Sequence, residues 1–156
     1  MTTLAKNIIK GFVLSVVILV LLISLAVYQR RAAVRAGNEA ATRQRLKTIA
    51  ASEIQYFNTH SRTFGTFEQM VKEGTLTNDF LERARIIEGY LFTLKVTPKE
   101  TNQESSYTLN ADPKAGNWEG AGRHFYLDST SLAIHVNPDR PASSTDPAYV
   151  PTALDP

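Results

Sequence analysis

Cysteine is absent from this chain of 156 residues. Its absence excludes disulfides, thiolate metal sites and cysteine nucleophiles, and it leaves the redox compartment open. Histidine is scarce as well, with only His60, His124 and His135. Two histidines brought side by side would still need a third ligand to hold zinc, and none is evident. No serine triad or phosphate-binding loop is evident either, so we expect neither an enzyme nor a bound cofactor.

Charge is missing from residues 12–28, a run of apolar or nearly apolar residues near the start of the chain. In a helix such a run reaches about 25 Å, which just spans the hydrocarbon core of a bilayer. A cleaved secretory signal is the alternative, but its apolar stretch is shorter, roughly 7–15 residues, and ends in a small-residue cleavage site. Here the run ends in Tyr28-Gln29-Arg30-Arg31. We therefore expect a transmembrane helix over residues 12–29.

Proline is absent from Gln29 to Asn58, and Gly37 is the only glycine there. Good helix formers dominate this stretch, and its apolar residues recur at helical spacing. The apolar stripe comprises Leu46, Ile49, Ala50, Ile54 and Phe57. This pattern predicts an amphipathic stalk helix over residues 30–59. We expect one continuous helix from about residue 5 to about residue 59, first in lipid and then on a soluble domain.

The net charge of +2 is unevenly distributed along the chain. Residues 1–47 carry eight Lys/Arg and one acid, whereas residues 48–156 carry nine Lys/Arg and fourteen acids. A basic helix thus precedes an acidic head, and we expect no nucleic-acid partner. The basic side chains that flank the apolar run are expected at the membrane interface, where they reach lipid headgroups. They are Lys6, Lys10, Arg30, Arg31 and Arg35.

Residues 60–137 predict a small head domain that begins with a short helix. Thr66 and Gln69 form a capping-box pattern, and Gly74 is placed to end the helix that follows. The apolar period then changes from helical to two, which is typical of strands half buried in an antiparallel sheet. We expect strands over residues 90–97, 106–110, 123–128 and 132–137.

The last two of these strands are expected to form a hairpin around a tight turn. The register pairs Leu127 with Leu132, Phe125 with Ile134, Tyr126 with Ala133 and His124 with His135. Both strands then agree on which face is apolar. We expect an antiparallel β-meander of three or four strands with the long helix across its apolar face, which is an α+β fold.

Five prolines and no apolar period mark the tail, residues 138–156. Such a tail should be extended or disordered when alone, and a partner is one way of holding it. Tyr149 in the tail and Trp118 in the glycine-rich loop 111–122 are candidate partner contacts. For Trp118 the alternative is a lid on the core, which is the more common role of a tryptophan.

The order of these pieces resembles the type IV pilins and the pseudopilins of type II secretion. That family has a short basic leader ending in glycine, an apolar helix that continues into an amphipathic stalk, and an antiparallel sheet. Residues 1–11 resemble the leader, so cleavage is expected between Gly11 and Phe12. The likeness covers roughly residues 5–137, and its clearest pieces are residues 40–57, 89–94, 106–113 and 122–130.

The sequence departs from the family pattern in the apolar helix. Val16 stands where the family usually has a glutamate that is thought to meet the free amino group of a neighbouring subunit, and Ala33 stands close to the place of a usual proline. A carboxylate in lipid is costly unless paired, so losing it removes both a cost and a register device. Some relatives hold calcium in a head loop, but Asp112, Glu119 and Asp139 lack the spacing of a known calcium loop.

The resemblance implies a structural protein of the bacterial inner membrane, with a periplasmic or otherwise extracytoplasmic head. It implies assembly with homologous subunits, through the apolar helix, into a pilus- or pseudopilus-type filament. The count of Lys/Arg on either side of the span slightly favours the opposite orientation. The alternative that accommodates Val16 is an uncleaved accessory subunit of a larger membrane complex, such as a photosynthetic or other energy-transducing one. Its helix would pack on other spans, and its head and tail would clamp partners.

Overall fold

In the computed structural model, residues 3–82, 85–114 and 122–151 are described, with the side chains of the first helix described from Lys10 onwards. The chain divides into two compact units, Met1–Val34 and Arg35–Pro156. Helix α1, Thr3–Thr59, contributes its first part to one unit and its second part to the other.

The first unit is the apolar part of α1. Between Phe12 and Tyr28 the large apolar side chains are 44–69% exposed. Ser15 and Ser24 turn their hydroxyls back to the carbonyls of Gly11 and Val20, four residues earlier, at 2.9 and 2.8 Å. Neither hydroxyl therefore needs a partner outside the helix. Among the described residues, one helix is long and apolar enough to cross a membrane, as the charge-free run predicts.

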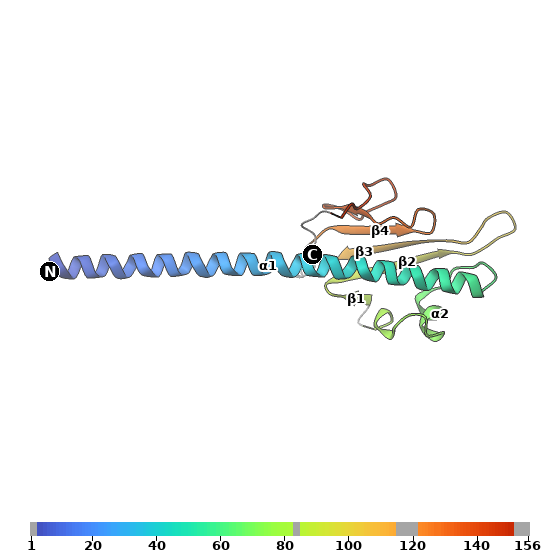
Figure 1. Ribbon diagram of the computed structural model, residues 1–156, viewed down its shortest axis with the longest axis horizontal. Helices are drawn as coiled ribbons and strands as arrows, with labels where there is room; N and C mark the ends of the chain where they lie inside the picture. The colour runs from blue at the N-terminus through green and yellow to red at the C-terminus, as the bar shows by residue number, and fades with distance from the viewer. Residues whose placement is uncertain (1–2, 83–84, 115–121, 152–156) are drawn as a thin grey trace. The chain divides into compact units, whose positions relative to one another are not determined.

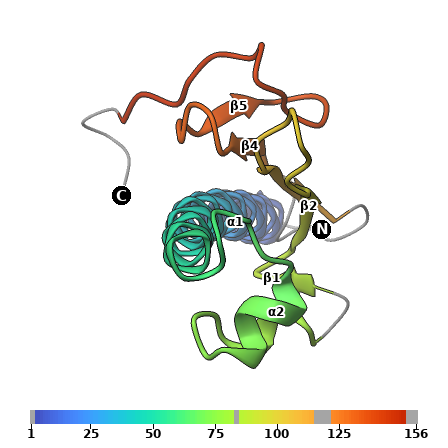
Figure 2. The same cartoon turned by 90° about the vertical axis from the view of Figure 1, so that its right-hand side faces the viewer.

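The second unit contains an antiparallel sheet of five strands in the order β1-β2-β3-β4-β5. The strands are β1 Ile86–Ile87, β2 Tyr90–Thr97, β3 Ser106–Pro113, β4 His124–Asp128 and β5 His135–Asn137. They run along the second part of α1, and the short helix α2 lies near the β1 edge (Figures 1 and 2). The α+β layout with a meander is confirmed, although β1 was not expected and β3 is three residues longer than predicted.

The core lies between α1 and the inner face of the sheet. Alternate residues of β3 and β4 point into it and pair across the strands, Leu109 with Leu127 and Ala111 with Phe125. From α1 the buried apolar residues are Leu46, Ile49, Ala50 and Tyr56. The period-two burial of the strands and the helical stripe thus meet in a single hydrophobic cluster.

The helix stripe differs from the predicted one in its last turns. Ile54 is 43% exposed, whereas Glu53 and Tyr56 are buried. At 100° per residue, Glu53 lies about 20° from the direction of Leu46, while Ile54 lies about 80° away. The geometry of the helix therefore places a carboxylate, and not Ile54, at the centre of the buried face.

The predicted hairpin register is wrong by two residues. The observed pairs are His124 with Asn137, Phe125 with Val136 and Tyr126 with His135. The turn is longer than predicted, because Leu132 adopts a positive φ of 53° and donates its N–H to the Asp128 carbonyl, so β5 begins only at His135. A shift of two residues keeps every side chain on its predicted face, but Leu132 itself is exposed.

Two short helical segments link α1 to the sheet. Helix α2, Phe67–Lys72, has the predicted capping box, in which Thr66 Oγ1 accepts from Gln69 N and Gln69 Oε1 accepts from Thr66 N. Gly74 follows with a φ of +73°, a conformation that glycine adopts without strain. The 3₁₀ helix η1, Asn78–Phe80, then leads towards β1.

The described part of the tail folds back on β5, so the expectation of an extended or disordered segment is wrong for residues 138–151. Val136 N donates to the Pro147 carbonyl at 3.0 Å, and Tyr149 N donates to the Ile134 carbonyl at 2.6 Å. The Asp146 carboxylate is buried beneath the loop. It accepts hydrogen bonds from the side chains of Asn137, Arg140 and Ser143. Contacts within the chain are what hold these residues.

Candidate functional site

The exposed apolar run Phe12–Tyr28 of α1 is one candidate functional surface, and the basic residues predicted at the membrane interface flank it. Lys10, Arg30 and Arg31 are exposed and Arg35 is half-buried, whereas the side chain of Lys6 lies outside the described residues. At the predicted cleavage point, Gly11 has nothing within 4 Å of the position that a Cβ would take. Phe12, on the other side of the same peptide bond, is exposed. The structure thus leaves this bond accessible, and cleavage itself stays a prediction.

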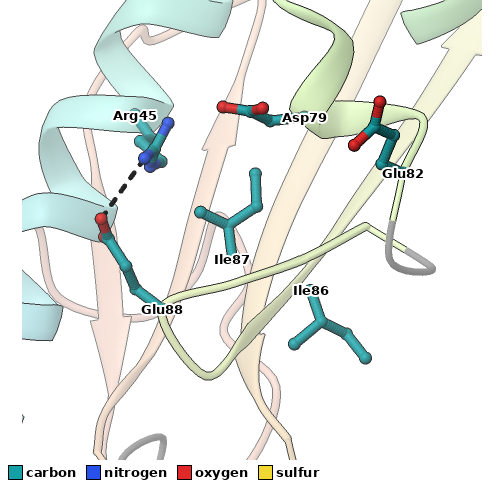
Figure 3. A pocket seen from close by; sticks show the side chains of 6 residues that line it. All are labelled: Arg45, Asp79, Glu82, Ile86, Ile87 and Glu88. Carbon is teal, nitrogen blue, oxygen red and sulfur yellow. Dashed lines mark hydrogen bonds and ion pairs between the residues drawn. The ribbon is translucent and has the colours of Figure 1, made fainter.

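A second candidate is a pocket of about 290 Å³ between α1, η1 and the β1 edge of the sheet. Figure 3 shows Arg45 reaching in from α1 and Ile87 lying in the wall, while Ile86 points to the other side of β1. The six lining residues are Arg45, Asp79, Glu82, Ile86, Ile87 and Glu88, and we call this site the acidic pocket. Three carboxylates against one guanidinium give its lining a net charge of −2.

Only one of these carboxylates is paired within the described chain. Arg45 Nη2 donates to Glu88 Oε1 at 3.3 Å, and both side chains are about one-third exposed. Asp79 and Glu82 are exposed, and neither has an ion-pair partner among the residues that the structure describes. The Asp79 carboxylate is turned towards Arg45 (Figure 3). A cation that enters the pocket therefore meets two carboxylates that form no ion pair within the described residues.

The acidic pocket borders a smaller cavity of about 200 Å³, which also includes Arg45. Its remaining lining comes from Thr48 on α1, from the segment that follows α2 and from the buried Phe80. The two hollows share Arg45 in their linings. The smaller one is mainly apolar and carries no acid, whereas the acidic pocket has three carboxylates.

Glu53 is a buried acid in the helix–sheet core. Its Oε2 accepts a hydrogen bond from Gly65 N at 2.9 Å, while Oε1 has no partner among the described residues. Burial raises the pKa of Glu53 to about 7, and the Gly65 hydrogen bond offsets part of the rise. Gly65 is needed here because a Cβ would lie 2.9 Å from the Tyr56 ring. Glu53 thus fixes the turn after α1, and no described group makes it a catalytic acid.

Tyr149, one of the predicted partner contacts, lies in a cluster of charged residues within the head. Glu39 Oε2 accepts from Arg123 Nε and Nη2 at 2.8 and 2.6 Å, a bidentate pair that joins α1 to the start of β4. The Tyr149 ring lies under the Arg43 guanidinium, 4.3 Å from ring centroid to Cζ. The half-buried ring is thus engaged inside the chain, and its contact with a partner stays a prediction. Trp118 lies outside the described residues.

The three histidines are dispersed and each has its own partner. His124 Nδ1 is 2.6 Å from Asp112 Oδ1, His60 Nε2 is 2.7 Å from Glu73 Oε1, and His135 Nδ1 is 2.6 Å from the Asp146 carbonyl oxygen. Because the hairpin register is shifted, His124 and His135 are not paired. Within the described ranges, no group of three His, Cys, Asp or Glu residues could hold a metal ion.

The acids considered for calcium do not come together in the described chain. Asp112 is occupied by His124, Asp139 is exposed in the tail, and Glu119 lies outside the described residues. Comparison with known proteins gives no relative, since the chain matches no protein-family model, no curated protein and no solved structure.

Sequence reasoning missed the acidic pocket and the role of Glu53. The pocket combines residues from α1, η1 and β1, and the two-residue strand β1 has no period from which to predict it. Glu53 could have been found, because it lies seven residues after Leu46, at the centre of the predicted apolar stripe. A carboxylate at a helix position that should face the core is a signal for a buried hydrogen bond.

Proposed function

We propose that this chain is a non-enzymatic, single-span, pilin-like structural protein that assembles through its apolar N-terminal helix into a pilus- or pseudopilus-type filament. The observation that carries the proposal is the run Phe12–Tyr28, whose large apolar side chains are all exposed. In water such a surface is unstable, whereas lipid solvates it and the helices of other subunits pack against it. Partners of this helix are therefore lipid and the apolar helices of homologous subunits.

The head supports the same proposal. A meander packed on the second part of α1 is the arrangement that the resemblance to pilins implies. With that resemblance we place the chain in the bacterial inner membrane, and its head outside the cytoplasm.

One observation favours a second function, that of an uncleaved accessory subunit in a larger membrane complex. Val16 occupies the position at which the resemblance expects a glutamate, and it is exposed on the helix. A helix without that carboxylate has no charged group for the amino terminus of a neighbour. It can still pack on the spans of unrelated subunits through apolar contacts, as many transmembrane helices do.

The intact mass of the protein purified from native membranes, with its co-purifying partners, tests both functions. The filament proposal predicts a mass that begins at Phe12 and co-purification with itself or with small homologous subunits. A mass that begins at Met1 or Thr2, within a large stable complex of unrelated subunits, would contradict the filament and favour the accessory role. A protein recovered alone, with or without residues 1–11, would contradict both.

A further inference from the structure

We propose that the acidic pocket binds the basic helix segment 30–35 of a neighbouring copy of this chain, and that this contact sets the axial offset between successive subunits. The inference rests on the filament form of the proposed function.

The acidic pocket has the chemistry to receive an arginine. Asp79 and Glu82 are exposed carboxylates without an ion-pair partner in the described chain, and Glu88 adds a third that Arg45 only partly neutralises. Ile87 supplies an apolar wall beside them (Figure 3). A guanidinium on a long methylene stem fits this combination better than a small hydrated cation does, because the stem packs on the wall while the head group meets the carboxylates.

Segment 30–35 supplies the complementary charge. It contains Arg30, Arg31 and Arg35 and no acid, and the next acid along the chain is Glu39. Arg30 is exposed and Arg35 half-buried, and neither has an ion pair within the described ranges. In a single subunit these side chains can reach anionic headgroups. When a subunit leaves the bilayer to join a filament, the arginines lose those headgroups, and carboxylates of a neighbour can replace them.

The symmetry of the contact also fits a filament. The pocket and the basic segment are different surfaces of one chain, so a contact between them is heterologous, and a heterologous contact that does not close generates an open helical array. If the helices of two copies are parallel, bringing Arg35 of one copy level with Arg45 of the next displaces the two copies along the helix axis by about 15 Å. With Arg35 engaged, the inference therefore predicts an axial offset of about 15 Å.

Cysteine crosslinking of the full chain in its native membrane tests this contact, since the natural sequence has no cysteine. Two differently tagged copies are co-expressed, one with Ala33→Cys in the basic segment and one with Leu81→Cys beside the pocket. Both positions are exposed. A short bismaleimide joins them if the contact forms. Thr101→Cys, in the loop at the far end of β2 from β1, replaces Leu81→Cys as the matched control. Val17→Cys in both copies reports helix packing separately.

Charge reversal then identifies the groups responsible. We expect a 33–81 crosslink that Arg35→Glu or Glu82→Lys lowers about tenfold, the change that loss of one partly desolvated charge pair produces. Combining the two reversals restores the crosslink. Lys95→Glu and Glu100→Lys make the same changes of charge at exposed positions elsewhere and leave it intact.

The two proposals fail in different ways. If 17–17 crosslinks form while the 33–81 yield is no higher than the 33–101 yield, this inference is overturned and the filament proposal stands. If no pair crosslinks, the filament proposal fails and the inference fails with it. If charge reversal changes nothing while a chelator removes the 33–81 crosslink, a bridging divalent cation occupies the pocket, which also overturns the inference.

Discussion

The two parts of α1 belong to one helix, but the more apolar part is exposed and the more polar part is partly buried. The run Phe12–Tyr28 is uncharged and yet its large apolar side chains are exposed. The later part of α1 is far more polar and yet is the part that is buried. Its buried face includes Thr42, Arg43, Ser52 and Glu53 beside the apolar Leu46, Ile49, Ala50 and Tyr56. Within the second unit, the face of α1 that packs on the sheet thus includes polar as well as apolar residues.

The difference indicates two environments for one helix: lipid for its first part, and the head domain with the surrounding water for its second part. Partners inside the chain satisfy part of this buried polarity, since Gly65 N donates to one carboxylate oxygen of Glu53 and Arg123 donates to Glu39. The apolar run keeps its backbone bonds and its serine hydroxyls inside the helix, so lipid can surround it without an unsatisfied group. Four pairs of matched substitutions test it, each comparing a buried or hydrogen-bonded side chain with one that is exposed or makes no such bond.

The largest difference is expected between isoleucine-to-alanine substitutions in the two parts of the helix. Ile49 is 0% exposed and Ile18 is 49% exposed. Ile49→Ala should lower the free energy of unfolding of the head by about 3 kcal/mol, because it leaves a cavity in the core. Ile18→Ala should leave the head unchanged within about 0.5 kcal/mol. Urea denaturation of the full chain in detergent, followed by near-ultraviolet circular dichroism, measures both. Equal losses would contradict the division of α1.

A pH-dependent effect of nearly the same size is expected at Glu53. Burial raises its pKa from 4.5 to about 7, so the folded state holds a proton that the unfolded state releases between these values. The stability of the natural chain should therefore fall as pH rises from about 4.5 to about 7, by about 3 kcal/mol in total, and then level off.

Glu53→Gln should remove this pH dependence. The amide keeps an oxygen for Gly65 N and carries no charge, so the variant should match the natural chain near pH 4 and exceed its stability by about 3 kcal/mol at pH 8. Glu104→Gln, at an exposed acid, is the control and should leave the slope intact. Parallel stability curves for the natural chain and Glu53→Gln would contradict the buried, protonated acid.

Ion pairs offer a smaller contrast. Glu39 is mostly buried in its bidentate pair with Arg123, whereas Glu104 is largely exposed and 4.0 Å from Lys99. Glu39→Gln should cost about 1–2 kcal/mol of head stability, since it weakens charge-assisted hydrogen bonds that water cannot fully replace. Glu104→Gln should cost roughly nothing, as exposed ion pairs usually do. Thermal unfolding of the two variants at one pH should show a lower midpoint for Glu39→Gln than for Glu104→Gln. The reverse order would contradict the prediction.

The smallest contrast concerns two threonines that precede helices. Thr66 caps α2 with its hydroxyl, whereas Thr77 precedes η1 and its side chain makes no capping hydrogen bond. Thr66→Ala should therefore cost about 1 kcal/mol, and Thr77→Ala close to zero. Urea titration resolves the difference if both variants are measured side by side. Equal costs would mean that the capping box contributes nothing measurable to the head.

Much of the fold follows from local patterns in the sequence. The charge-free run and the absence of proline up to Asn58 predict α1, and Thr66 with Gln69 predicts the start of α2. Period-two alternation predicts the central strands. Each of these signals depends on neighbours a few residues apart, which is why a single sequence is sufficient to find them.

The remaining features depend on contacts between distant segments. The hairpin register is set by the positive φ of Leu132, a conformation that leucine seldom adopts and that no turn rule assigns to it. The buried Asp146 holds the tail in place. The acidic pocket forms only because the short edge strand β1 lies beside Arg45. None of these has a local pattern, so only the folded chain reveals them.

The most direct test of the two-environment account is a measurement of what surrounds each part of α1 in the native membrane. A single cysteine at Ile18 or at Ala51, both exposed, can carry a nitroxide spin label because the natural chain has no cysteine. The account predicts that oxygen, which dissolves in lipid, relaxes the label at position 18 more than a water-soluble nickel complex does, and that the order is reversed at position 51. A nickel complex that reaches position 18 as readily as position 51 would contradict the account.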